Sequence, residues 1–230
     1  MKSKNTIAII PARSGSKSIR NKNIKTLINK PLIAWSIQSC LKSKYISKIY
    51  VSTDSKRYAN IAKKFGPIEI IFRPKHLSKD NSSDFNMIYH AIKNIDFEYE
   101  FIAHIRPTTP IRKISDINKA IKIFKNSKCD SLRSVHEMSE TSYKSVEIKK
   151  GNLRTLKNIN LNMDQINSPR QGFSKTFTPN GVIDLYKKKF ILKKKLLFGK
   201  NVKGYKTLFT PEIDNLQDFK YIEFLCQKKK

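Results

Sequence analysis

The chain has 230 residues, and its 47 basic and 18 acidic residues give a formal net charge of +29 at pH 7. This length suits one α/β domain that buries about 70% of its unfolded surface, so a disulfide scaffold is not needed. The cysteines, Cys40, Cys129 and Cys226, are far apart and odd in number, which argues against a zinc knuckle or a redox pair. We therefore expect a cytoplasmic protein, and no stretch approaches the ~20 apolar residues of a membrane helix.

The charge alone would suggest a nucleic acid or another anionic surface as the partner. However, 38 of the 47 basic residues are lysine, spread along the chain together with 31 isoleucines and 18 asparagines. An A+T-rich coding composition produces that bias without any partner. The lysine runs also lack the interleaved arginines and aromatic residues of a single-strand channel. We expect a solvated basic surface and no specific nucleic acid, and a basic nucleic-acid-binding protein is the alternative from another class.

Short apolar runs alternate with helix-length amphipathic stretches in the first part of the chain. In chain order we predict strand 7–10, helix 32–41, strand 48–52, helix 55–65, strand 68–72, helix 84–95, strand 101–105 and helix 115–124. This alternation is typical of an α/β fold with a mainly parallel twisted sheet and flanking helices.

The pattern changes from residue 131 onward. Extended segments are predicted at 131–136, 144–148 and 153–156, with a turn at 150–152, followed by strands 181–186 and 205–209 and a closing helix 215–226 capped by Asn215. Because no linker interrupts the chain, we predict a single domain over 1–230. A small β-rich lobe is inserted at about 136–180, where it would serve dimerisation or sugar binding.

Polar residues cluster where the predicted strands end. Ligands of open α/β sheets bind at the carboxyl ends of the strands, so the loops after Ile10, Ser52, Phe72 and Ile105 should meet at one cleft. The first of these loops, 11–23, mixes four basic residues with small and hydroxyl residues. Backbone N–H groups, hydroxyls and cations together suit a triphosphate. The loop is neither a P-loop nor a GxGxxG turn, and a plain basic surface loop is the alternative.

The segment IAIIPARSGSKSIRNKNI, residues 7–24, resembles the N-terminal signature of the acylneuraminate cytidylyltransferases, which are similar in fold to nucleotide-diphospho-sugar transferases. The resemblance continues in order through KPLIAWSI (30–37), VSTD (51–54), RP (73–74), RPTTPIR (106–112), PRQ (169–171), PNG (179–181) and ID (213–214). It implies transfer of CMP from CTP to the anomeric hydroxyl of a 2-keto-3-deoxy sugar acid of sialic acid type, with release of pyrophosphate. Legionaminic, pseudaminic or ketodeoxyoctonic-type acids are alternative acceptors.

The resemblance also implies roles for particular residues. The CTP-binding set is Ala12, Arg13, Ser14, Gly15, Ser16, Lys17, Lys22, Asn23, Arg73 and Ser82, the catalytic set is Arg13, Lys17 and Asp214, and the sugar-binding set is Arg106, Arg170 and Asn180. Asp214 and Glu212, two carboxylates at i and i+2 near the end of a late strand, would hold Mg²⁺.

Several positions depart from the family pattern. Arg106 replaces the usual glutamine, Thr178 replaces an arginine, and Asn81 and Asp84 stand where threonine or serine is more usual. Arg106 and Thr178 predict a familiar CTP half and an altered sugar half, whereas Asn81 and Asp84 belong to the loop that resembles the cytosine-reading loop of the family and leave its detail open. Asp54 would either contact the nucleotide or cap the next helix. The four histidines lack metal-ligand spacing, no covalent nucleophile is indicated, and a homodimer without membrane contact is expected.

Overall fold

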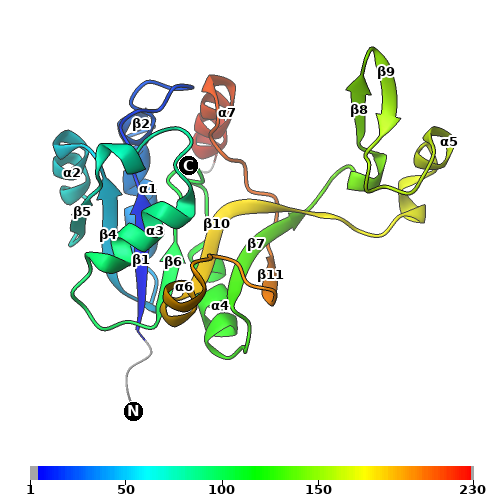
Figure 1. Cartoon of the computed structure of the whole chain (residues 1–230). Coiled ribbons are helices and arrows are strands. Elements are labelled where there is room, and N and C mark those ends of the chain that lie inside the picture. Colours follow the sequence, from blue (N-terminus) through cyan, green and yellow to red (C-terminus); the bar gives the residue numbers. More distant parts are fainter. Residues whose placement is uncertain (1–4, 229–230) are drawn as a thin grey trace.

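The computed structural model describes residues 5–228, and a seven-stranded sheet of order β11-β7-β10-β6-β1-β4-β5 runs through its centre (Figure 1). The strands are β1 (Thr6–Pro11), β4 (Ile46–Thr53), β5 (Glu69–Phe72), β6 (Phe101–His104), β7 (Ser131–Glu137), β10 (Phe177–Lys187) and β11 (Val202–Lys206). Within this sheet β10 is antiparallel to its neighbours β6 and β7, and the other pairings are parallel. The predicted mainly parallel sheet with flanking helices is confirmed.

Helices cover both faces of this sheet. Residues of α1 (Leu32–Leu41), α2 (Lys56–Lys63) and α4 (Ile114–Lys125) pack in one apolar cluster, and those of α3 (Asp84–Lys93) and α6 (Lys188–Lys194) pack in another. The side chains of β1 alternate between the two, with Ala8 and Ile10 in the first cluster and Ile7 and Ile9 in the second. Burial on both faces explains why β1 reads as a continuous apolar run.

The C-terminal helix covers a third apolar cluster beside the sheet. In α7 (Leu216–Gln227), Phe219 and Ile222 pack against Ile19, Leu27 and Leu32. Leu27 lies in the short hairpin of β2 (Thr26–Leu27) and β3 (Lys30–Pro31), Leu32 is the first residue of α1, and Ile19 lies in the loop before the 3-10 helix η1 (Lys22–Ile24). The predicted cap is confirmed, because the Asn215 side chain accepts the amide N–H groups of Gln217 and Asp218 and forms a capping box.

The inserted lobe lies between β7 and β10, which carry it away from the body of the molecule (Figure 1). It contains the hairpin β8 (Val146–Lys149) and β9 (Asn152–Thr155) and the helix α5 (Met163–Ile166). Two 3-10 turns, η3 (Ser142–Lys144) and η4 (Arg170–Gly172), complete it. Lys150 and Gly151 form the predicted turn, both with positive φ. The chain leaves β7 after Glu137 and enters β10 at Phe177, close to the expected limits.

Two late segments differ from the prediction. The strand predicted at 205–209 is β11, which ends at Lys206, so Leu208 and Phe209 are exposed loop residues. The carboxylate pair at 212 and 214 therefore does not lie at the end of a strand. Instead, the amide of Ile213 donates to the carbonyl of Thr108 at 2.8 Å and ties this segment to the loop after β6.

The three cysteines are free thiols. Within residues 5–228, none of the helices has both the length and the apolar character needed to cross a membrane.

Candidate active site

A cavity of about 560 Å³ opens at the carboxyl ends of β1, β5 and β6. Three of the four loops that were predicted to meet lie there, whereas no residue of the loop after β4 lines the cavity. Its walls carry six basic side chains and two carboxylates, namely Arg13, Lys17, Lys22, Arg73, Lys79 and Arg106, with Asp80 and Asp84. This volume suits a small-molecule ligand, and the excess of cations suits one that carries several negative charges.

Five of the predicted CTP-binding residues of the phosphate loop line this cavity: Arg13, Ser16, Lys17, Lys22 and Asn23. Asn23 is buried and donates its side-chain amide to the carbonyl of Arg13 at 3.0 Å, which fixes the backbone that presents the arginine. The Lys22 ammonium donates to the carbonyl of Ile213 at 3.0 Å, and burial lowers the pKa of Lys22. The cavity therefore contains cations that are held by the fold itself.

Ala12, Ser14 and Gly15 do not line the cavity with the rest of the loop. Ala12 is fully buried, and its amide extends the ladder to Ser52 at 2.8 Å. Ser14 donates its amide and its hydroxyl to the two carboxylate oxygens of Asp54, at 2.8 and 2.9 Å. Asp54 therefore anchors the loop, and the side chain that caps α2 is Ser55.

Asp80 lies between two of the predicted phosphate-binding cations. Its carboxylate accepts from Nη1 of Arg13 at 2.5 Å and pairs with the ammonium of Lys17 at 2.7 Å. Hydrogen bonds from Lys17 and Arg13 lower the pKa of Asp80. Because these ion pairs are exposed, they are weak, and an incoming phosphate can replace the carboxylate.

Arg73 and Ser82 lie where the loop after β5 meets the cavity. Arg73 is buried, its Nη2 donates to the carbonyl of Ser52 at 3.4 Å, and burial lowers its pKa. Its Nε has no partner among the residues that the structure describes. The Ser82 hydroxyl donates to the carbonyl of His76 at 3.3 Å. Both residues therefore line the cavity, and their role in CTP binding stays a prediction.

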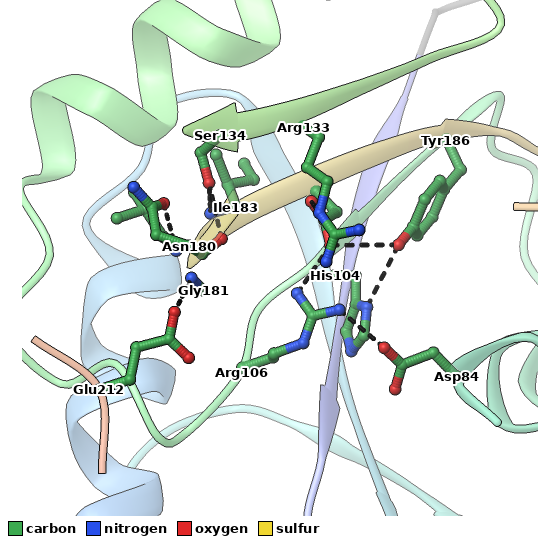
Figure 2. Close-up of polar contacts among 12 residues, drawn as sticks. Asp84, His104, Arg106, Arg133, Ser134, Asn180, Gly181, Ile183, Tyr186 and Glu212 are labelled. Atoms are coloured by element: carbon green, nitrogen blue, oxygen red, sulfur yellow. Dashed lines mark hydrogen bonds and ion pairs between the residues drawn. The ribbon is translucent and has the colours of Figure 1, made fainter. Parts of the chain in front are cut away.

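Arg106 lies on the wall of the cavity, but its guanidinium is already paired (Figure 2). Nη1 donates to Asp184 and Nη2 donates to Asp84, each at 2.7 Å. Asp184 is fully buried on β10, where Arg133 lies 3.5 Å from its other oxygen. The charge of Arg106 is therefore compensated within the fold, and its role in sugar binding stays a prediction.

A second arginine of the same loop is wholly internal. Arg112 donates to the carbonyls of Arg106, Gly181 and Val182 and to the hydroxyl of Ser36, at 2.5 to 3.2 Å. Burial lowers the pKa of Arg112 to about 10, which leaves it charged at neutral pH. It joins the loop after β6 to β10.

Glu212 and Asp214, the predicted metal ligands, lie beside Lys22 but outside the cavity lining. Glu212 accepts the amide N–H of Gly181, and burial raises its pKa, whereas Asp214 is exposed. Oxygen donors of this kind fit Mg²⁺ that keeps several waters and phosphate oxygens. The part of the chain that the structure describes has no cluster of three acidic, histidine or cysteine side chains that would form a closed metal site.

Two predicted sugar-binding residues lie outside this cavity. Arg170 belongs to the lobe, where it donates to the carbonyl of Met138 at 2.8 Å and lines a separate cavity of about 430 Å³. Asn180 is buried, and its side chain contacts Thr207 at 3.0 Å and His136 at 3.3 Å. Its amide is therefore used inside the fold.

Sequence reasoning assigned no role to several lining residues, among them Lys79, Asp80, Met87 and Thr108. The loop after β5 did carry a signal, because it follows a predicted strand on the same edge of the sheet as the phosphate loop. No local pattern indicated that Asp80 would face Arg13, which lies 67 positions earlier.

Known proteins resemble the chain in sequence and in fold. A family model described as cytidylyltransferase matches residues 7–229. The N-acylneuraminate cytidylyltransferase of Escherichia coli is 34% identical over 226 residues, which cover 97% of this chain and 52% of that protein. The post-translational flagellin modification protein B of Campylobacter coli is 29% identical, and the match covers 97% of this chain and 95% of that protein.

The fold matches a solved structure of a CMP:2-keto-3-deoxy-manno-octonic acid synthetase complexed with CTP. The TM-score is 0.76 at 15% identity, and the match covers 98% of this chain and 100% of the other. The chain thus spans about half the length of the Escherichia coli relative and nearly all of the Campylobacter one. Because the family match covers almost every residue, the chain belongs to the cytidylyltransferase family.

Proposed function

We propose that the chain transfers CMP from CTP to the anomeric hydroxyl of a 2-keto-3-deoxy sugar acid of sialic acid type and releases pyrophosphate. The observation that carries this proposal is the cavity at the ends of β1, β5 and β6, where Arg13 and Lys17 are paired with a displaceable carboxylate. The sialic acid activity named for the Escherichia coli relative supports the choice of acceptor class.

The residues of this chain would act by positioning and by electrostatics. Arg13 and Lys17 would neutralise the charge that develops on the leaving pyrophosphate, and Arg73 would bind the cytosine acceptor atoms. Asp214, assisted by Glu212, would hold Mg²⁺, which supplies charge compensation at the phosphates when it is bound. The anomeric hydroxyl would attack the α-phosphorus in line, and none of these residues stands out as a general base.

The acceptor need not be N-acetylneuraminate, and a legionaminic, pseudaminic or ketodeoxyoctonic-type acid is the alternative. The observation in favour of the alternative is Arg106, which occupies a sugar-side position and is compensated by Asp84 and Asp184. We further propose that the protein acts in the cytoplasm without a specific nucleic acid partner.

We also propose that the chain is a homodimer that forms through the inserted lobe. One face of the β8–β9 hairpin exposes Val146, Ile148 and Leu153, and the last two are directly paired across the strands. An apolar face of this kind is suited to a second copy of the lobe. Sedimentation of the protein and of Ile148→Asp measures this, and a monomeric unmodified protein would contradict it.

The central test is pyrophosphate release with CTP, ATP, GTP and UTP, each combined with a panel of acidic keto sugars and Mg²⁺. We expect turnover with CTP and one acceptor class, and no release with any pair would refute the enzyme assignment. Arg13→Ala should lower kcat by on the order of 100-fold or more, because a donor to developing charge is lost. Arg20→Ala, an exposed residue of the same loop outside the cavity, is the matched control.

A further inference from the structure

The acceptor side of the cavity can be located from the order of the strands. The phosphate loop follows β1, which lies in the sheet between β6 on one side and β4 and β5 on the other. Arg73 follows β5, and Arg106 follows β6. If CTP binds as proposed above, its base lies toward β5 and its phosphates lie over β1. The acceptor must then approach from the side of β6 and β10.

Arg106 on that side is fixed from inside the protein. Its ion pair with Asp184 is buried, because Asp184 has no exposed surface and Arg106 exposes only 18% of its side chain. Arg112 also donates to the backbone carbonyl of Arg106 at 2.5 Å. Moving the guanidinium toward a ligand would leave the buried carboxylate of Asp184 with only the Tyr186 hydroxyl at 3.4 Å and Arg133 at 3.5 Å, which is unfavourable because its short ion pair is lost.

Arg106, Arg133, Asp84 and Asp184 form one charged group, and Asp84 is the acid of this group that faces the cavity. It lies in the first turn of α3, lines the cavity and exposes 47% of its side chain. One of its oxygens accepts from Arg106, and the other makes no hydrogen bond with any described residue. Burial opposes ionisation, but the neighbouring His104, Arg106 and Arg133 together outweigh it and hold the pKa of Asp84 below its ordinary value.

The group therefore presents an acceptor to the ligand rather than a cation. Arg106 and Arg133 carry two positive charges, and Asp84 and Asp184 carry two negative charges, so the group is neutral overall. Its exposed element is a carboxylate oxygen, which accepts hydrogen bonds and repels other carboxylates. An O–H or N–H group of the ligand satisfies it, whereas an acidic group does not.

We propose that Asp84, oriented by Arg106, is a specificity-determining residue that accepts a hydrogen bond from a hydroxyl or N–H substituent of the acceptor sugar. Asp84 discriminates acceptors by the presence of this donor, and the carboxylate of the sugar binds elsewhere in the cavity. Arg106 is a positioning residue, since it acts through Asp84. This inference rests on the proposed function and specifies the acceptor of the same site.

The test uses pairs of acidic keto sugars that differ by one substituent, in which a hydroxyl or amide N–H at each ring position is present or replaced by hydrogen. We expect the unmodified enzyme to prefer the donor-bearing sugar at one position by about 10- to 100-fold in kcat/KM, the range of one charge-assisted hydrogen bond. In Asp84→Ala this ratio should fall to within about 3-fold of unity, while KM for CTP is unchanged.

Asp116→Asn is the matched control, because Asp116 is also an acid in the first turn of a helix and lies outside this cavity. It should keep the preference of the unmodified enzyme. If Asp84→Ala turns over with an unchanged preference for the donor-bearing sugar, the inference is overturned and the proposed function stands. The same holds if Asp84→Ala loses discrimination between CTP and UTP and keeps its sugar preference. No turnover by the unmodified enzyme with any pair would overturn the proposed function and the inference with it.

Discussion

Gly181 on β10 lies where the structure has no room for a side chain. A Cβ added at this position would meet the hydroxyl of Thr109 well inside 3.0 Å and both carboxylate oxygens of Glu212 at 3.2 Å. The amide of Gly181 also donates to Glu212, and its carbonyl accepts from Arg112. Thr109 and the backbone of this region are buried, so the neighbours have little freedom to move. We predict that Gly181→Ala forces them apart.

Overpacking of this kind costs about 1–3 kcal/mol. For a chain of this size each kcal/mol lowers the melting temperature by roughly 2–4 °C, so we expect Gly181→Ala to melt about 3–10 °C lower than the unmodified protein. Circular dichroism on heating measures the shift. Gly172→Ala is the control, because a Cβ there meets nothing within 4 Å, and its change should stay within about 0.5 kcal/mol.

Thr109→Ala provides a second arm. The Thr109 hydroxyl is buried and has no hydrogen-bond partner among the described residues, so its removal should be tolerated. It also removes the nearest atom that the new methyl group would meet. The penalty of Gly181→Ala should therefore shrink by about 0.5 kcal/mol or more in the Thr109→Ala background. An equal penalty in both backgrounds, or a Gly181→Ala protein that melts with the unmodified one, would refute the packing argument.

Two further predictions follow from charged groups. Asp80→Asn frees Arg13 and Lys17 for the nucleotide and should therefore lower KM for CTP. The control is Asp164→Asn, which changes an exposed acid of the lobe and should leave KM unchanged. Initial rates at varied CTP measure both, and an unchanged KM in Asp80→Asn would contradict the prediction. Burial, with the charge of Arg106 acting in the same direction, lowers the pKa of His104 to about 3. Because the folded protein binds a proton at His104 less readily than the unfolded chain does, the free energy of unfolding is highest above the unfolded pKa of 6.5. It falls as pH decreases toward 3, by about 2 kcal/mol between pH 7 and pH 5. Urea unfolding should show that His104→Gln lacks this part of the pH dependence, and equal slopes would count against it.

The elements that sequence predicted well are those whose signals are local. β1 is an apolar run that is buried on both faces, and α7 begins at a capping box formed by Asn215 and Asp218. The phosphate loop follows β1 directly, so its place at the edge of the sheet needed only the rule for parallel strands. These features depend on residues within a few positions of one another.

The sugar side depended on contacts between distant segments. The ion pairs of Arg106 could not be predicted, because its two partners, Asp84 and Asp184, lie 22 and 78 positions away. Nothing near residue 106 shows that an antiparallel strand from the end of the chain enters the sheet beside β6. Asn180 looked like a donor to a polyol for the same reason, and its amide instead bonds to Thr207 inside the fold.

The strand β10 connects the inserted lobe to the part of the cavity that contains Arg106. It pairs with β7 on both sides of a register shift between Pro179 and Asp184, and the residues within that shift provide the carbonyl and amide groups that Arg112 and Glu212 bind. The first residues of β10 follow the lobe directly, and farther along the same strand Asp184 accepts from Arg106. A change in the lobe or in β10 therefore reaches the acceptor side through one strand. The phosphate loop follows β1, which is separated from β10 by β6, so the two strands are not adjacent in the sheet.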